Sequence, residues 1–312
     1  DFGLNANFNI SYNRAKIDKL AGGQTWQSSN WGGKPAGQND FFIEEGGRLG
    51  EVYGYELDGF YTTDDFSWDG SKWILNENLT DPTELIKYNN FGPGSLKLKA
   101  DEDGKFTKKR LGNTVPTVTG GFGINMRYKN FDLSAFFNYS LGNKIVNATK
   151  LGSSYYNDTK KGWNLNDNFT LAKRYSWIDP STGENMLKSS YIKSNGLDYT
   201  INRLNEINAG ASMYNPGSIT EMPLLDWAVE DGSFLRVNNI SIGYTLPKVF
   251  VNKMFMQNVR IYVTGYNLYC FTKYSGADPE VDTRRSTPMT PGVDYSAYPK
   301  SRSFVGGINV TF

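Results

Sequence analysis

The residues Phe2-Gly-Leu-Asn-Ala-Asn-Phe-Asn-Ile-Ser-Tyr12 give the clearest indication of the fold class of this chain. Every second residue is apolar, and each residue between them is glycine, asparagine or serine. Such strict alternation predicts a β-strand with one apolar face and one polar face. Eleven residues match the length with which a tilted strand crosses a bilayer, whereas strands of soluble sandwiches commonly stop at about five or six. The stretch therefore predicts a membrane-spanning strand.

The same period returns in two adjacent stretches, 122–128 and 131–139, separated only by Lys129 and Asn130. The parity of the pattern reverses across these two residues. In a two-residue hairpin the flanking residues, here Tyr128 and Phe131, oppose each other and share a face, so this reversal is what the geometry requires. The pattern predicts a tight antiparallel hairpin with an aromatic-rich apolar face.

Weaker or shorter alternation predicts five further wall strands. They lie at 52–60, 95–100, 235–246, 259–268 and 303–312. Long polar stretches separate the strands, at 13–42, 61–94, 141–233 and 269–302. Loops of that length are uncommon in compact soluble domains but usual on the extracellular side of outer-membrane barrels. The expected fold is all-β, an antiparallel transmembrane β-barrel wall with long extracellular loops.

Composition excludes several classes of protein. The 312 residues include 33 Lys+Arg and 32 Asp+Glu, no His and one Cys, Cys270. A net charge of +1 gives no field for binding nucleic acid. Metal sites and nucleophilic pairs that need His or several Cys are impossible within the chain. With no apolar run of about 18 residues, a spanning helix is excluded too. We expect neither catalytic residues nor cofactor or metal.

The chain begins with Asp1, and neither a basic stretch nor an apolar stretch of a signal peptide follows. We therefore expect a fragment, or the ordered part of a longer protein.

Two groups of acidic residues invite functional interpretations. The loop 99–110 places Asp101, Asp103 and Gly104 in the register of an EF-hand, but Lys99 and Arg110 occupy positions where calcium needs oxygen ligands. A plain turn is the favoured interpretation, and a degraded calcium site is the alternative. Pairs such as Asp64 and Asp65 could serve a glycosidase, but a chain with 32 acids yields many accidental pairs. Solvated loop charge explains them better.

Aromatic residues cluster in the predicted loops. The candidates for stacking against a sugar or peptide ligand are Trp26, Trp31, Trp68, Trp73, Tyr155, Tyr156 and Trp163. Aromatic rings also form interfacial girdles in barrels and pack the interior of long ordered loops. Packing or a girdle is the favoured role, and ligand contact is the alternative.

Several motifs, taken in order, resemble the C-terminal barrel portion of SusC-like (RagA-like) TonB-dependent transporters of the Bacteroidetes outer membrane. In the first half they are Glu45-Gly46 through Gly50, Tyr53-Gly54-Tyr55, Asp58-Gly59-Phe60, Pro93-Gly94 through Asp101, Asp103-Gly104 and Gly112-Asn113. In the second half they are Asp231-Gly232-Ser233-Phe234-Leu235-Arg236, Gly243-Tyr244-Thr245-Leu246-Pro247, Val263-Thr264-Gly265-Tyr266-Asn267-Leu268, Phe271 through Glu280, Tyr298-Pro299 and the terminal Asn309-Val310-Thr311-Phe312. The chain departs from the family at Arg48, where Pro is usual, and at Lys99 and Arg110, where many relatives carry acids.

The resemblance implies a barrel of about 22 strands with a plugged lumen. Residues 1–312 would form its last eight or so strands, without the N-terminal plug domain and the TonB box. It implies nutrient import, of an oligosaccharide or a peptide, together with a SusD-like surface lipoprotein and with TonB acting through the absent N-terminal part. Outer-membrane lipids would surround the wall. Two other functions remain as alternatives: a structural SusC-like subunit of a larger outer-membrane assembly, and a soluble β-sandwich that binds glycans.

The last strand resembles the signal by which the BAM machinery recognises barrels during assembly. Aromatic and aliphatic residues alternate along it, and the chain ends on an aromatic residue. We assign the signal to Phe304, Ile308, Val310 and Phe312. A simple lipid-facing position for these four residues is compatible with that role.

Overall fold

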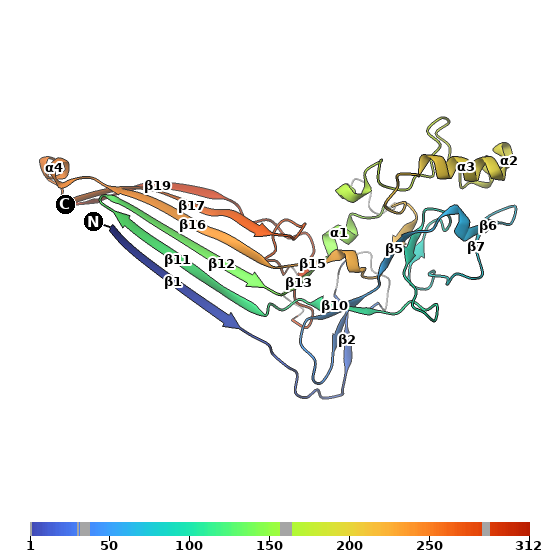
Figure 1. The fold of residues 1–312 in the computed structure, drawn as a ribbon, viewed down its shortest axis with the longest axis horizontal. Coiled ribbons are helices and arrows are strands. Elements are labelled where there is room, and N and C mark those ends of the chain that lie inside the picture. Colours follow the sequence, from blue (N-terminus) through green and yellow to red (C-terminus); the bar gives the residue numbers. More distant parts are fainter. Residues whose placement is uncertain (1, 30, 32–37, 157–163, 283–287) are drawn as a thin grey trace.

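The computed structural model consists of one sheet of long antiparallel strands and a loop region built from the connections at one end of that sheet (Figure 1). It describes residues 2–29, 31, 38–156, 164–282 and 288–312. The long strands are β1 (Phe2–Tyr12), β11 (Val118–Tyr128), β12 (Phe131–Leu141), β16 (Phe234–Thr245), β17 (Asn258–Thr272) and β19 (Ser303–Thr311). They are neighbours in chain order, and both chain ends lie at the end of the sheet remote from the loop region (Figure 1).

The predicted hairpin has the predicted register. β11 and β12 pair with Tyr128 opposite Phe131, so only Lys129 and Asn130 form the turn. β1 pairs with β11 along its whole length, from Phe2 opposite Tyr128 to Tyr12 opposite Val118. The apolar residues of the alternating pattern therefore share one face of the sheet, as the sequence predicts.

That apolar face is exposed, and the opposite face is polar. Phe2 and Phe8 are about two-thirds exposed, at 64% and 65%, and Phe304 at 68% is similar. A contiguous apolar surface across several strands is the property of a wall that faces lipid. A β-sandwich would pack this face against a second sheet. The structure therefore argues against the soluble alternative.

The loop region contains short strands and short helices. The strands are β2 (Thr25–Gln27), β3 (Phe41–Ile43), β4 (Glu51–Gly54), β5 (Leu57–Phe60), β6 (Phe66–Trp68), β7 (Trp73–Leu75), β8 (Lys87–Tyr88), β9 (Leu96–Leu98), β10 (Lys109–Asn113), β13 (Lys144–Asn147), β14 (Ile219–Glu221), β15 (Val229–Asp231) and β18 (Val293–Asp294). The helices are α1 (Ala148–Gly152), α2 (Ser189–Asn195) and α3 (Leu197–Ile207), with α4 (Lys248–Val251) at the other end of the sheet. No helix among the described residues is long and apolar enough to cross a bilayer.

Two predicted wall strands lie in the loop region instead. The segment 52–60 divides into β4 and β5, which belong to different sheets, and the segment 95–100 supplies β9, which pairs with β5. Val52, Leu96 and Leu98 are buried in a protein core. Alternation marks a strand with one apolar face but does not say whether lipid or protein covers that face. The long sheet accordingly has six strands rather than about eight.

The loop region has two hydrophobic cores of its own. The larger core collects residues of β3, β4, β9, β13 and the segments around 214–228, and includes Phe41, Val146 and Leu225. The smaller core packs Tyr61 and Trp177 against α2 and α3. Both cores lie outside the long sheet, so the connections form a folded cap rather than a set of separate loops.

Candidate functional site

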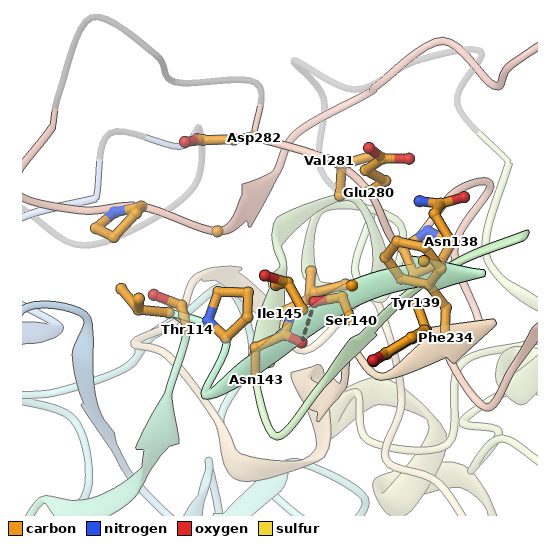
Figure 2. Close-up of a pocket in the computed structure, with 18 of the residues that line it drawn as sticks. Thr114, Asn138, Tyr139, Ser140, Asn143, Ile145, Phe234, Glu280, Val281 and Asp282 are labelled. Atoms are coloured by element: carbon orange, nitrogen blue, oxygen red, sulfur yellow. Dashed lines mark hydrogen bonds between the residues drawn. The ribbon is translucent and has the colours of Figure 1, made fainter. Parts of the chain in front are cut away.

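A cavity of about 730 Å³ lies where the polar face of the sheet meets the loop region (Figure 2). Its floor is formed by Asn9 of β1, by the cap-side ends of β11 and β12, and by Phe234 of β16. The segment 279–282 lies across it, and the segments 114–116 and 291–292 close its side. In Figure 2, Glu280, Val281 and Asp282 lie on one side of the cavity, and Asn138 and Ser140 come from the strand opposite.

The strand register builds the floor. Asn9, Gly121, Asn138 and Arg236 form one transverse row on the polar face, because each opposes the next on the neighbouring strand. The absence of a side chain at Gly121 makes room for the Phe136 ring, since a Cβ there would lie 3.2 Å from the ring carbon Cζ. The Asn9 side chain accepts a hydrogen bond of 3.1 Å from the Gly121 backbone N–H. The floor thus combines polar groups with the aromatic residues Phe136, Tyr139 and Phe234.

Arg236 ties the 278–282 segment to the wall. Its Nη2 donates a hydrogen bond of 2.5 Å to Oδ1 of Asp278, and both side chains are almost fully buried. The same Asp278 oxygen accepts the backbone N–H of Glu280 at 2.9 Å. Glu280 also lies 3.5 Å from Nε of Arg236 and forms an ion pair with Lys300. A buried pair of this kind is costly to break from one side, so the segment has a fixed position over the floor.

Two polar atoms at the cavity are buried without a hydrogen-bond partner among the described residues. They are Oδ1 of Asn138 and Oδ1 of Asp282. Buried polar atoms are normally paired, and an unpaired one commonly marks a place for water or a ligand. Ser140 and Asn143 add a hydroxyl and an amide, linked by a hydrogen bond of 3.4 Å (Figure 2). The cavity therefore suits a ligand rich in hydroxyl or amide groups.

Three of the aromatic residues proposed as ligand contacts are buried in the cores. Trp31, Trp73 and Tyr155 are exposed by only 3%, 8% and 2%. Nε1 of Trp31 donates a hydrogen bond of 3.4 Å to Asp40. Trp73 packs edge to face on Trp68, with ring centroids 5.5 Å apart. These positions agree with the packing role. Little ring surface is left for a ligand, because the three residues belong to the hydrophobic cores of the loop region.

The other aromatic candidates do not form one site. Trp26 is partly exposed, packs against the tilted ring of Phe42 with 4.6 Å between ring centroids and lies beneath the ammonium of Lys108. Tyr156 borders a separate groove of about 630 Å³ that also includes Leu171 and Arg174. The last candidate, Trp163, lies outside the described residues. Ligand contact by the seven aromatic candidates stays a prediction.

The residues of the cavity are ones that the sequence pattern did not single out as a site. Asn138 and Ser140 look like ordinary polar positions of an alternating strand, and only the register places them together with Arg236 and Phe136. One signal was present: Asp278 belongs to a motif that resembles the family, and the structure gives it the role of anchoring the segment over the cavity.

The acidic loop at 101–105 is a turn in the structure. Oδ1 of Asp101 accepts the backbone N–H groups of Lys105 at 2.8 Å and Asp103 at 3.1 Å. The hydrogen bond from Lys105 is the largest cause that lowers the pKa of Asp101. No group of three or more His, Cys, Asp or Glu side chains suited to a metal ion occurs in the part of the chain that the structure describes.

The residues assigned to the assembly signal lie on the apolar face of β19 or at its end. Their exposed fractions are 68% for Phe304, 64% for Ile308, 40% for Val310 and 77% for Phe312. Exposure on the apolar face is what a lipid-facing position requires. Recognition by the BAM machinery stays a prediction.

An apolar outer face, a polar inner face and a folded cap at the long-loop end together define a wall segment of a transmembrane β-barrel.

No family model matches the chain. The chain is 31% identical to TonB-dependent receptor P3 of Formosa agariphila, over 100% of this chain and 27% of that protein. It is 23% identical to TonB-dependent receptor SusC of Bacteroides thetaiotaomicron, over 100% of this chain and 25% of that protein.

A solved structure of the RagAB peptide importer in its closed-closed state superposes with a TM-score of 0.55 and 21% identity, over 100% of this chain and 28% of that chain. Over its whole length the chain is therefore similar to TonB-dependent receptors, among them SusC, and these relatives are outer-membrane proteins and not enzymes. It spans about a quarter of the length of the curated relatives that it matches.

Proposed function

We propose that this chain forms part of the wall and of the extracellular cap of an outer-membrane importer, and that its cavity contacts the nutrient on its way into the lumen. The cavity at the junction of wall and cap supports this proposal, because Asn138 and Asp282, whose buried Oδ1 atoms have no hydrogen-bond partner among the described residues, line a space large enough for part of an oligosaccharide or a peptide. Both kinds of nutrient present hydroxyl or amide groups to such oxygens.

The orientation follows from the loop lengths. Outer-membrane barrels have short turns on the periplasmic side and long loops outside. The turn at Lys129 and Asn130 then lies in the periplasm, and the loop region with its two cores lies outside the cell. A SusD-like surface lipoprotein would cover the cap, and TonB would act through an N-terminal part outside this chain.

The experiment substitutes a cavity residue in the full-length protein and measures growth on oligosaccharides or on peptides as the nutrient source. Asn138→Leu should reduce uptake of the transported class. Asn125→Leu is the matched control. Asn125 lies on the neighbouring strand β11 and on the same polar face of the sheet as Asn138, but outside the cavity. Both variants must reach wild-type levels in the outer membrane.

Two outcomes separate the proposals. Reduced uptake of only one nutrient class by Asn138→Leu identifies that class. Unchanged uptake of both classes, in Asn138→Leu and in cells without TonB, would reject import and favour the alternative of a structural subunit.

We also propose that Phe312 and the apolar residues of β19 serve assembly by the BAM machinery. Deleting Phe312, which is exposed at the end of the last strand, should lower the amount of assembled barrel. Equal outer-membrane levels of the deletion variant and the wild type would contradict this role.

A further inference from the structure

The acidic residues of the segment over the cavity differ in their counter-charges. Asp278, Glu280 and Asp282 follow each other at every second position. Asp278 forms the buried ion pair with Arg236, and Glu280 forms an ion pair with Lys300 and lies 3.5 Å from Nε of Arg236. Among the described residues, no cation forms an ion pair with Asp282, and its buried Oδ1 accepts no hydrogen bond. The first two carboxylates are thus compensated and the third is not.

The lining of the cavity has no positive charge to offset Asp282. Glu280 and Asp282 both line the cavity (Figure 2), whereas no lysine or arginine is among the described residues that line it. Arg284 and Arg285 follow in the sequence and lie outside the described residues. Because Glu280 already has counter-charges, the described lining has one uncompensated negative charge, at Asp282. Such a cavity repels an anionic ligand and attracts a cationic one.

The buried polar atoms without partners at this cavity are acceptors. They are Oδ1 of Asn138 and Oδ1 of Asp282, so both need a donor. A protonated amine or a guanidinium has several N–H donors and no acceptor, whereas a hydroxyl has one donor and acceptor lone pairs of its own. Hydrogen bonds in which one partner is charged are also the stronger ones. A cationic donor therefore matches these acceptors better than a hydroxyl does.

An aromatic ring adds a second surface that suits a cation. Phe136 lines the cavity from the polar face of β12 and is 38% exposed. The guanidinium of Arg236 lies 5.4 Å from the ring centroid of Phe234, but none of the described cations lies over the Phe136 ring. Aromatic faces attract cations, and the methylene stems of lysine and arginine pack on apolar surface. The cavity therefore offers a carboxylate and an open ring to the same ligand.

We propose that the cavity selects a nutrient with a protonated amine or a guanidinium, which binds beside Asp282 while its apolar part packs on Phe136. A peptide with lysine or arginine presents such a cation, and so does an oligosaccharide with free amino groups. This proposal rests on the proposed function, in which the nutrient contacts this cavity, and it narrows the class of nutrient by charge.

The test measures equilibrium binding to the full-length protein purified from outer membranes in a mild detergent, so it requires no transport. The peptide probes are Ala-Lys-Ala-Ala and Ala-Gln-Ala-Ala with both termini blocked, so that the lysine side chain is the only charge. The sugar probes are the tetramers of glucosamine and of N-acetylglucosamine, which differ in the charge of the amine. Each pair thus compares a cation with a neutral ligand of similar size.

Asp282→Asn removes the charge and keeps the shape of the side chain. Asp103→Asn is the matched control, because Asp103 is an exposed acid of the cap that does not line the cavity. We expect wild type and control to bind the cationic member of at least one pair about tenfold more tightly than the neutral member. Asp282→Asn should lower this preference by about fivefold. Added salt should also reduce the wild-type preference.

The two pairs of probes separate the two sources of the cation. A preference within the peptide pair alone identifies basic peptides, and one within the sugar pair alone identifies amino sugars. Equal binding of charged and neutral probes in both pairs would overturn the proposal. A preference that Asp282→Asn leaves at its wild-type value would overturn it as well.

Uptake by the Asn138→Leu variant separates this proposal from the import proposal. If Asn138→Leu lowers uptake while the protein binds charged and neutral probes equally, import stands and selection by charge fails. If cation binding depends on Asp282 while Asn138→Leu and the loss of TonB both leave uptake unchanged, the cation site stands and import fails.

Discussion

Gly94 occupies a position in the cap that a side chain cannot enter. Its φ of +85° is in the left-handed region, and a Cβ there would lie 2.2 Å from Cδ1 of Tyr175. Its backbone N–H donates a hydrogen bond of 2.6 Å to the backbone carbonyl of Tyr61, and its own carbonyl accepts one of 2.7 Å from the backbone N–H of Asn215. Three segments far apart in the sequence therefore meet at one residue without a side chain.

We predict that Gly94→Ala destabilises the cap by about 3 kcal/mol, because left-handed strain and steric overlap with the Tyr175 ring add. Gly70→Ala is the control, since Gly70 has a φ of +97° but no atom within 4 Å of its Cβ position. It should cost only the strain, about 1–2 kcal/mol. Hydrogen exchange of the amides around α2 and α3 in the full protein measures both variants. Equal effects would show that the ring contact contributes nothing.

Asp179 connects a turn of the cap to two helices. Its Oδ2 accepts the Tyr191 hydroxyl of α2 at 2.6 Å, and its Oδ1 lies 3.2 Å from Nη2 of Arg203 on α3. The hydrogen bond from Tyr191, followed by the N–H of Ser181 and by Arg203, lowers the pKa of Asp179 to about 2. The native state therefore favours the ionised carboxylate.

A lowered pKa in the folded state sets the sign of the pH dependence. The stabilising contribution of Asp179 is complete above the unfolded pKa of about 3.9 and is lost as the pH falls through the folded value. We predict that protection of α2 and α3 amides from exchange is constant from neutral pH to about 5 and falls between about pH 4 and 2. Asp179→Asn should remove that part of the pH dependence. The same acid transition in the variant would assign it to other groups.

At the scale of elements, three strands are joined on the polar face by an ion pair that crosses the middle strand. Arg260 of β17 donates to Asp132 of β12, with Nη2–Oδ2 at 2.6 Å and Nε–Oδ1 at 2.9 Å. Gly243 of β16 lies beneath the pair, and a Cβ there would be 2.4 Å from Arg260 Nη2. The missing side chain lets the two charged groups meet across β16.

We predict that Gly243→Val breaks this pair and lowers the stability of the barrel by about 2 kcal/mol. Gly3→Val is the matched control, because Gly3 lies on the same polar face of β1 and its nearest neighbour would be 3.9 Å from the new Cβ. The temperature at which the folded barrel changes its gel mobility measures both. In an Asp132→Ala background the Gly243→Val effect should shrink, since the pair is already absent. An undiminished effect would exclude the ion pair as its cause.

The strands and helices also show which parts of the fold the sequence pattern could predict. Side-chain alternation predicted the six wall strands and the register of the hairpin, because period two and turn length together fix which residues share a face. It wrongly assigned 52–60 and 95–100 to the wall, because a strand on a protein core alternates in the same way. Helices α2 and α3 were missed inside a polar stretch, where Ile192 and Leu204 bury a narrow apolar stripe against the smaller core.

In the whole molecule, the cavity could not be predicted because it depends on contacts between residues that are far apart in the sequence. Its floor depends on neighbouring strands being in register, and the segment above it depends on one buried pair, Arg236 with Asp278, 42 residues apart. A single sequence contains no information on such separations. The aromatic clusters were more conspicuous, but none of their described rings lines the cavity.

The long sheet has two open edges among the described residues. β1 and β19 are its outermost strands, with unpaired backbone groups on their far sides among the described residues. In a bilayer these groups must be paired, so the sheet has to close with strands beyond these six or upon itself. Closure upon itself would give a barrel smaller than the about eight strands that are the known minimum. We therefore predict that β1 and β19 pair with other strands and not with each other.

Cysteine cross-linking in outer membranes tests this arrangement directly. Asn5 and Val305 occupy the same transverse row at opposite edges, but closure into a barrel would stagger that row by several residues at the seam. In a Cys270→Ser background, cysteine at Asn5 or Asn9 is therefore combined in turn with cysteine at Ser303, Val305, Gly307 or Asn309 on the polar face of β19, and none of these pairs should form a disulfide. Asn125→Cys with Ser134→Cys should form one, because these residues oppose each other on β11 and β12. A disulfide between the edges would mean that the six strands close into a barrel too narrow for the lumen that import requires, and the position of the cavity above that lumen would then lose its significance.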